Sequence, residues 1–574
     1  MYILGINAFH ADSSACLLKD GVVICASEEE RFRRIKHWAG FPSEAIKFCL
    51  TEAKISVEDL DYITISRNPR ANVSKKIIHT IKNRVEIKSV LDRLLNTKRV
   101  ASVKSELANL FRVKESDIKA DIHNIEHHRS HIASAFFASS FKESAILSID
   151  GFGDFTSTMT SVGVGNKIKV LDCVNYPHSL GLLYTTVTQF LGFHNYGDEY
   201  KVMGLAPYGE PKYLKELSEI IQKTDDGFFK LNKKYFKHFK SGVAMDWENG
   251  EPKIDLLFTK QWEVLFWSAR NMRDDIKQFH IDLATSVQRF TEQMIFYILT
   301  KLQRKTGLVN LCITGGVAQN SVANGKILSH TPFEKLYVPS AGHDAGTSIG
   351  SALYLYNHIL NKDRLPEIKT AYFGQKSSEE EIITCLNAEN IKFERLEDEY
   401  LFNKVSDKLI NGGVVGWFQG RAEFGPRALG HRSILVDPRR KDAKDLLNKK
   451  IKRRESFRPF APSILEEYVE EYFVQNDNVP FMEKVFDIKK EKQSEIPAVT
   501  HVDGTGRLQS VNKDISPRFY RLISEFKSKS GVPILLNTSF NDNEPIVNKP
   551  KEALDCFLRT KMDMLVMENI IIER

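Results

Sequence analysis

The chain has 574 residues, of which 42% are hydrophobic and 27% charged, a balance typical of a globular protein with several domains. Its net charge of +7, from 81 basic and 74 acidic residues, is too small for this length to require a nucleic-acid partner. No apolar run approaches the ~20 residues that cross a bilayer, no basic leader opens the chain, and the seven cysteines form no C-x-x-C pair. We therefore expect a cytoplasmic protein with no membrane or nucleic-acid partner and no disulfide framework.

The first predicted elements form a strand–loop–hairpin unit that returns later in the chain. Asp20-Gly21 favours a tight turn between the second and third strands of the first copy. The strands are residues 2–7, 15–18 and 22–26 in the first copy, and residues 145–149 and 156–164 in the second, around a polar loop at 150–154. A duplicated unit of this kind is typical of actin-like (ASKHA) nucleotide-binding folds, whose loop amides hold phosphate oxygens and whose carboxylates hold a metal.

Two glycine turns, each between a strand and a helix, strengthen this interpretation. Gly315 and Gly316 follow a predicted strand at 309–314, and a helix begins near Asn320. Gly342 and Asp344 follow a second strand about thirty residues later. Because a phosphate or adenosine group can approach the backbone at such turns, the pair predicts one ligand crevice.

A polar, irregular stretch at 361–376 predicts a domain boundary. We expect a first domain over residues 1–365 and a second α/β domain over residues 385–574. The second domain includes predicted strands at 414–417 and 532–536.

Three histidines open an Ala-rich stretch that is compatible with a helix. Residues four apart share a helix face, so His127 and His131 can point at one metal, whereas His128 is expected to face away and tolerate replacement. Asp150 ends a buried-type strand and Asp344 lies in a glycine turn, so two His and two Asp would suit Fe(II), Mn(II) or Zn(II). Ordinary polar residues at a helix start remain the alternative on spacing alone.

Three further segments carry polar side chains in irregular backbone. Residues 197–209 run from charged residues into an apolar Gly/Pro string, which predicts the lip of a cleft or a tight surface turn. Arginines in Gly/Pro loops between 420 and 460 favour an anion trap, with an RNA-binding surface as the competing interpretation. The strand end at 536–541 presents amide and hydroxyl groups that suit a planar carbamate, although a plain Asx or Ser turn explains it equally well.

Taken together, these segments resemble the NodU/CmcH family of O-carbamoyltransferases over nearly the whole chain. The strings that carry the resemblance are Glu28-Glu29-Glu30-Arg31-Phe32, Lys36-His37, the His127-His128-x-x-His131 cluster, Met203-Gly204-Leu205-Ala206-Pro207-Tyr208-Gly209, Gly315-Gly316-Val317-Ala318-x-Asn320, Glu423-Phe424-Gly425-Pro426-Arg427-Ala428-Leu429-Gly430, Phe457-Arg458-Pro459-Phe460-Ala461-Pro462 and Leu536-Asn537-Thr538-Ser539-Phe540-Asn541. The family often has Gly-Lys where this chain has Tyr200-Lys201. That difference concerns the acceptor side of the cleft.

The resemblance implies an α/β protein with an actin-like (ASKHA) transfer domain followed by a YrdC-like domain. In such enzymes, carbamoyl phosphate and ATP with Mg²⁺ give carbamoyl-adenylate in the second domain, and a hydroxyl of a small molecule or sugar (an antibiotic, another secondary metabolite or a glycan) attacks it in the first. By motif position the implied metal ligands, with iron expected, are His127, His131, Asp150 and Asp344, and the implied nucleotide contacts are Gly315, Gly316, Asn320 and Lys201. The implied carbamoyl phosphate contacts are Arg427, Lys452, Arg458 and Arg507, with Asn537, Thr538 and Ser539 supporting the carbamate. The catalytic candidates are His10, Asp12 and Lys36.

Two other functions stay open at this point. A tRNA threonylcarbamoyladenosine-type enzyme would share both domains, and a non-catalytic nucleotide- or RNA-binding protein is the other alternative. Both predict a strongly salt-dependent affinity for RNA. The acceptor and the oligomeric state, a homodimer included, are not determined by these patterns.

Overall fold

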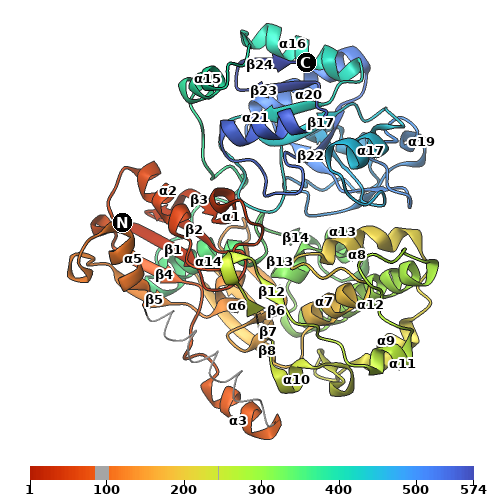
Figure 1. Cartoon of the computed structure of the whole chain (residues 1–574). Helices are drawn as coiled ribbons and strands as arrows, with labels where there is room; N and C mark the ends of the chain where they lie inside the picture. Colours follow the sequence, from red (N-terminus) through yellow and green to blue (C-terminus); the bar gives the residue numbers. More distant parts are fainter. Residues whose placement is uncertain (84–101, 244) are drawn as a thin grey trace. The chain divides into compact units, whose positions relative to one another are not determined.

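A computed structural model describes residues 1–83, 102–243 and 245–574 (Figure 1). The described chain divides into two compact units, residues 1–368 and 369–574. The division falls within the irregular stretch at 361–376, which carries no regular secondary structure.

The first unit contains two five-stranded sheets with the same strand order. The strands are, in order, β3 (Val22–Glu28), β2 (Ser14–Lys19), β1 (Tyr2–Asn7), β4 (Tyr62–Ile65) and β5 (Asp121–Asn124) in one sheet, and β8 (Lys167–Asn175), β7 (Thr156–Val164), β6 (Glu143–Gly153), β13 (Asn310–Thr314) and β14 (Lys335–Tyr337) in the other. In each sheet the first three strands are antiparallel and the last three are parallel. This repeat confirms the predicted duplicated actin-like unit.

Helices α6 (His127–Phe136) and α14 (Thr347–Leu353) lie between these sheets and pack against each other (Figure 1). Their approach is so close that a Cβ at Gly350 would lie 1.8 Å from the Ser130 carbonyl oxygen. On the other side, a Cβ at Gly5 of β1 would lie 2.1 Å from the Ser348 carbonyl oxygen. The glycines at these two crossings allow α14 to pack closely against both α6 and β1.

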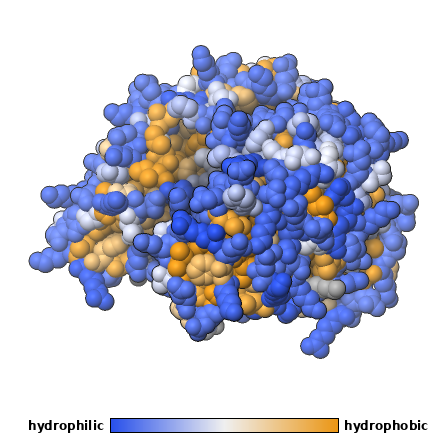
Figure 2. All heavy atoms as spheres, turned by 90° about the horizontal axis from the view of Figure 1, so that it is seen from above, coloured by the Kyte–Doolittle hydropathy of each residue, from blue (hydrophilic) through white to orange (hydrophobic). Residues whose placement is uncertain are grey.

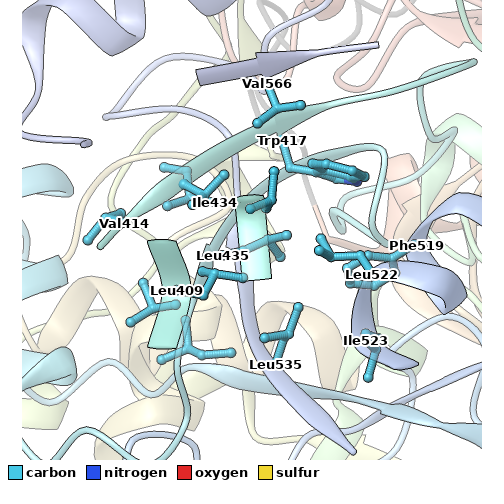
Figure 3. Packing of buried hydrophobic residues seen from close by; sticks show 14 of the residues in the cluster. Leu409, Val414, Trp417, Ile434, Leu435, Phe519, Leu522, Ile523, Leu535 and Val566 are labelled. Atoms are coloured by element: carbon cyan, nitrogen blue, oxygen red, sulfur yellow. The ribbon is translucent and has the colours of Figure 1, made fainter. Parts of the chain in front are cut away.

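The second unit is built around one mixed eight-stranded sheet. Its strands are, in order, β15 (Glu394–Arg395), β24 (Ile570–Glu573), β23 (Met564–Met567), β16 (Val415–Phe418), β17 (Arg432–Val436), β22 (Ile534–Ser539), β18 (Ala461–Leu465) and β21 (Gln509–Val511). Helices α16 (Asp398–Ile410) and α20 (Pro517–Ser530) pack together over a fully buried core that includes Trp417, Ile434 and Leu535 (Figure 3). The predicted α/β fold class is therefore confirmed, with a duplicated actin-like unit followed by a second α/β unit.

One predicted loop is wrong. Residues 199–205 form helix α8 (Glu199–Leu205), followed by a short 3₁₀ turn, Ala206–Tyr208. Pro207 lies inside that turn and Gly209 directly after it, so both residues end the helix and neither prevents it. The Gly/Pro string therefore marks the end of a helix, and the helix-forming residues before it are what make that helix.

The surface carries mixed polarity. Hydrophilic residues predominate on the face drawn in Figure 2, and hydrophobic residues form separate patches there. Within the described ranges, no helix combines the length and the apolar character that a membrane span needs.

Candidate active site

The start of helix α6 brings two of the predicted ligands together. The Glu126 side chain accepts a hydrogen bond from the Arg129 backbone N–H and so caps the helix at its first turn. His127 and His131 are four residues apart on one face, and their Nε2 atoms lie 3.1 Å from each other. Both imidazoles are buried.

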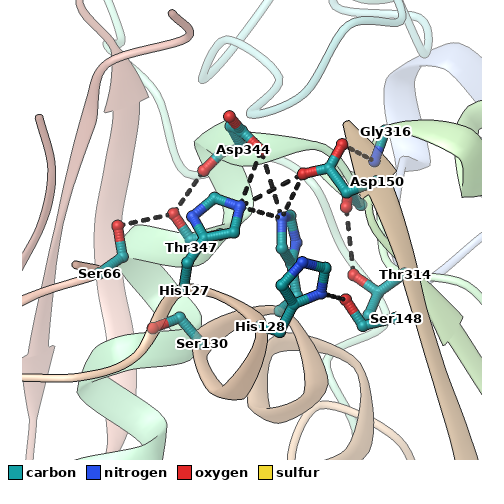
Figure 4. A network of polar contacts seen from close by, with 12 residues as sticks. Ser66, His127, His128, Ser130, Ser148, Asp150, Thr314, Gly316, Asp344 and Thr347 are labelled. Atoms are coloured by element: carbon teal, nitrogen blue, oxygen red, sulfur yellow. Dashed lines mark hydrogen bonds and ion pairs between the residues drawn. The ribbon is translucent and has the colours of Figure 1, made fainter. Parts of the chain in front are cut away.

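Two carboxylates from distant segments complete the set (Figure 4). Asp150 comes from β6, and its Oδ2 lies 3.2 Å from His127 Nε2 and 3.3 Å from His131 Nε2. Asp344 comes from the turn before α14, and its Oδ1 lies 3.2 Å from His131 Nε2. One donor atom from each of the four residues lies within 4.8 Å of the other three.

The geometry and charge of this four-residue set suit a divalent transition ion. Ligand atoms about 2.1 Å from one ion lie about 3 Å apart at right angles, close to the separations found here. Burial lowers the pKa of both histidines, but the two carboxylates outweigh it and raise the pKa of His127 and His131 above the ordinary value. Burial raises the pKa of Asp150 and Asp344, but the histidines outweigh it and lower both. The carboxylates therefore stay ionised, and a bound cation would replace the protons that the two histidines hold in its absence.

The glycine turns hold the carboxylates in place and lie side by side. The Gly316 N–H donates to Asp150 Oδ1 at 3.0 Å, and the Gly315 N–H donates to the Gly342 carbonyl at 2.7 Å. Gly315 has a φ of 96°, and a Cβ there would lie 2.2 Å from the Ile149 carbonyl oxygen, so no other residue fits. The second turn carries Asp344, and both turns therefore meet at the four-residue set.

The two other predicted nucleotide contacts are engaged within the protein. Asn320 caps helix α13 (Ser321–His330) by accepting from the Ala323 N–H, and its amide pairs with Gln288. Lys201 on α8 is buried and forms an ion pair with Asp198 at 2.8 Å. Asn320 and Lys201 are thus each held by a partner within the first unit.

The predicted catalytic candidates lie in and beside the first hairpin loop. His10 Nδ1 is 3.1 Å from Asp344 Oδ2, and His10 Nε2 is buried without a hydrogen-bond partner among the described residues. Asp12 accepts a hydrogen bond from His37 Nδ1 at 2.7 Å. Lys36 is exposed, one residue before His37. The hairpin loop thus borders Asp344 directly.

The sequence interpretation did not single out His37. The short string Lys36-His37 was the signal that could have found it, but its partner Asp12 lies 25 positions earlier. Burial lowers the pKa of His37, but Asp12 outweighs it and raises the pKa to about 9. Asp12, Glu30 and His37 also present donor atoms close to one another. The 2.7 Å contact is shorter than the separation expected between two ligands of one ion, so it is a direct hydrogen bond.

In the second unit, Lys452 holds the polar end of β22. Its side chain is buried, and Nζ donates to the Asn541 carbonyl at 2.9 Å, to Asn541 Oδ1 at 2.6 Å and to Ser539 Oγ at 3.2 Å. Thr538 is half-buried beside Ser539. Asn537 is buried and donates to the Ala428 carbonyl at 3.3 Å, which ties β22 to the loop of Arg427.

Some of the arginines predicted to bind carbamoyl phosphate lie close to one another in the second unit. Burial and the nearby guanidinium groups of Arg427 and Arg454 lower the pKa of Arg507 well below its ordinary value. Like charges held close together in this way favour an anion between them. Arg458 forms an ion pair with Glu455 at 2.5 Å. Arg427 and Arg507 thus form one cationic group with Arg454, which was not among the predicted carbamoyl phosphate contacts.

Comparisons with known proteins follow the two units. The carbamoyltransferase N-terminus family matches residues 2–353, and the carbamoyltransferase C-terminus family matches residues 406–574. An uncharacterised protein of Synechocystis sp. is 39% identical over 100% of this chain and 97% of its own length. Nodulation protein NolNO of Sinorhizobium fredii is 37% identical over 99% of this chain and 80% of its own length. The 3'-hydroxymethylcephem-O-carbamoyltransferase of Amycolatopsis lactamdurans is 32% identical over 45% of this chain and 47% of its own length.

Proposed function

This chain belongs to the carbamoyltransferase family, and we propose that it is an ATP-dependent O-carbamoyltransferase acting on a hydroxyl of a small molecule or sugar. The observation that carries the proposal is the four-residue set, which the chain assembles from three separate segments beside two glycine turns. Relatives named for nodulation and for a cephem acceptor support a secondary metabolite, antibiotic or glycan as the acceptor.

The first half-reaction belongs to the second unit. Water releases phosphate from carbamoyl phosphate, a carbamate oxygen attacks the α-phosphorus of ATP, and pyrophosphate leaves. The cationic group of Arg427, Arg454 and Arg507 supports the binding of the phosphate oxygens, because guanidinium forks match them in pairs. Lys452 keeps the β22 end in place for the carbamate.

The second half-reaction belongs to the first unit. The acceptor oxygen bonds to the carbamoyl carbon, the bond from that carbon to the phosphate oxygen breaks, and AMP leaves. His10 Nε2, which has no hydrogen-bond partner among the described residues, is the proposed acceptor of the hydroxyl proton, and the Asp12–His37 pair lies in the same loop region. The glycine turns would receive the adenosine end.

The proposed metal is Fe²⁺ or another divalent transition ion held by His127, His131, Asp150 and Asp344, while Mg²⁺ accompanies ATP. When bound, such an ion supplies positive charge that offsets the phosphate. Gly316 N–H fixes Asp150, and His10 contacts Asp344, so the protein orients both carboxylates without help from the ion.

The test is pyrophosphate exchange into ATP. We expect exchange only when carbamoyl phosphate is present, because adenylation precedes acceptor binding. Exchange that depends on L-threonine and bicarbonate would replace this proposal with the tRNA-modifying reaction. Salt-dependent RNA affinity without any exchange would favour a binding protein.

A further inference from the structure

Arg67 lies two residues after the end of strand β4, and its charge has no ion-pair partner among the described residues. Its side chain is half-buried, and its one hydrogen bond runs from Nη1 to the Phe9 carbonyl at 3.1 Å. Asp344, Asp154 and His10 all lie within electrostatic reach of the guanidinium. No described residue forms an ion pair with it. A guanidinium has five N–H donors, so most of those on Arg67 have no partner in the part of the chain that the structure describes.

The residues on either side of Arg67 in the sequence, Ser66 and Asn68, both make contacts near the four-residue set. The Thr347 hydroxyl donates to Ser66 Oγ at 2.9 Å and contacts the Asp344 carbonyl at 2.6 Å (Figure 4). The Asn68 N–H donates to Asp154 Oδ2 at 2.7 Å. The same Asp154 oxygen accepts the His127 N–H at 3.0 Å. The neighbours of Arg67 are therefore anchored to two of the three segments that carry metal-ligand candidates, α6 and the turn of Asp344.

A partly desolvated guanidinium whose N–H groups lack hydrogen-bond partners costs folding free energy unless a ligand accepts those hydrogen bonds. Arg67 lies near the candidate cation site and the first hairpin loop, and a guanidinium there favours an anion with several oxygens, because its N–H groups bind such oxygens in pairs. We propose that Arg67 binds the phosphate of the adenylate at the transfer site and stabilises the charge that AMP gains as it leaves. This inference rests on the proposed function, since it assigns one contact within the transfer half-reaction.

The chemistry favours the phosphate over the acceptor. As the bond between the carbamoyl carbon and the phosphate oxygen breaks, the electron pair stays on the phosphate, so negative charge grows there. A neutral hydroxyl acceptor gains no such charge, because its proton passes to a base. A fixed cation within reach of Asp344 is placed where that charge develops.

The experiment compares AMP with adenosine in the full-length, metal-loaded protein. The variants are Arg67→Ala and Arg67→Lys, and the matched control is Arg70→Ala, an exposed arginine in the same segment. We expect Arg67→Ala to raise the inhibition constant of AMP, measured on transfer from supplied carbamoyl-adenylate, by about 10- to 100-fold. Adenosine inhibition should stay unchanged, Arg67→Lys should be intermediate, and free guanidinium should partly restore the Arg67→Ala rate.

Three results would overturn the inference. Equal weakening of AMP and adenosine without guanidinium rescue would mean that Arg67 only supports the fold, and unchanged inhibition by both would mean that it makes no ligand contact. A raised KM for the acceptor with unchanged AMP inhibition would mean that it binds the acceptor. If the wild-type protein transfers nothing, the proposed function fails, but equilibrium dialysis of AMP and adenosine still tests Arg67. Arg67→Lys keeps the test decisive if Arg67→Ala does not fold.

Discussion

His128 provides a sharp test of how the start of α6 is built. It bonds to Ser148 and Thr156 and not to the metal-ligand candidates, and it is fully buried, so we expect its replacement to lower stability without removing the metal. The Thr156 carbonyl can only accept, so Nε2 carries the proton and donates to it at 3.0 Å. Nδ1 then accepts from the Ser148 hydroxyl at 2.8 Å. Burial lowers the pKa of His128 to about 3, which keeps this neutral form at all working pH values.

We expect His128→Ala to lower the free energy of unfolding of the first unit by about 2–5 kcal/mol. The Thr156 carbonyl would lose its partner inside the protein, which costs about 1–3 kcal/mol, and the removed ring would leave a cavity with a cost of similar size. The assay is thermal unfolding together with hydrogen exchange across α6 and β7. Metal content per folded molecule should not change, since neither bond of His128 reaches the four-residue set.

Two control variants separate the bonds. His128→Asn can replace only the contact near Ser148, and His128→Gln only the contact near Thr156, so each should recover part of the loss. Wild-type stability in His128→Ala would refute the reasoning. So would a selective loss of metal from a protein whose exchange pattern is unchanged.

Three further predictions concern the proposed chemistry. His131→Ala should lower metal content to a small fraction of one ion per protein and block transfer but not adenylation. The double variant with His127→Ala should be no worse, because the two histidines act as one site. Elemental analysis together with assays of both half-reactions checks this, and full metal content in either variant would disprove it. Arg458→Ala should abolish adenylation by removing a contact worth about 2–5 kcal/mol and spare transfer from supplied carbamoyl-adenylate, whereas equal loss of both rates would contradict two separate sites. The folded pKa of His37 lies above its ordinary value of 6.5, so its contribution to stability is fully present below about pH 6.5 and is lost as the pH rises through about 9. The free energy of unfolding of His37→Gln and of Asp12→Asn should therefore fall less steeply with pH across this range than that of the wild type. Equal pH dependence in the variants and the wild type would contradict the Asp12–His37 ion pair.

The fold was predictable because its signals are local. The turn at Asp20-Gly21, where both residues have positive φ, and the repeated strand–loop–hairpin plan specify each sheet half within short segments. The strand predicted at 156–164 appears with those bounds as β7. Helix α8 was missed because glycine and proline after its first residues were given more weight than the helix formers among them.

The candidate site was predictable only where one element carries the pattern. The four-residue spacing of His127 and His131 places both on one helix face, and the glycine turns identify themselves by composition. The partnership of Asp12 with His37 joins residues 25 apart through a loop without regular structure. Arg67 depends on anchors at Asp154 and, through Ser66, at Thr347. Such contacts arise from the packing of distant segments, so the local periodicity of the sequence does not predict them.

The measurement that tests the central claim most directly is mass spectrometry of the products formed from carbamoyl phosphate, ATP and a panel of sugars and aminoglycosides. The proposed function predicts a carbamoylated acceptor together with AMP and pyrophosphate, made by the wild-type protein and not by His131→Ala. The same carbamoylated acceptor from His131→Ala would contradict the assignment of transfer to the four-residue set. Consumption of ATP with no carbamoylated acceptor, and threonylcarbamoyl product when tRNA and L-threonine are supplied, would contradict O-carbamoyl transfer itself.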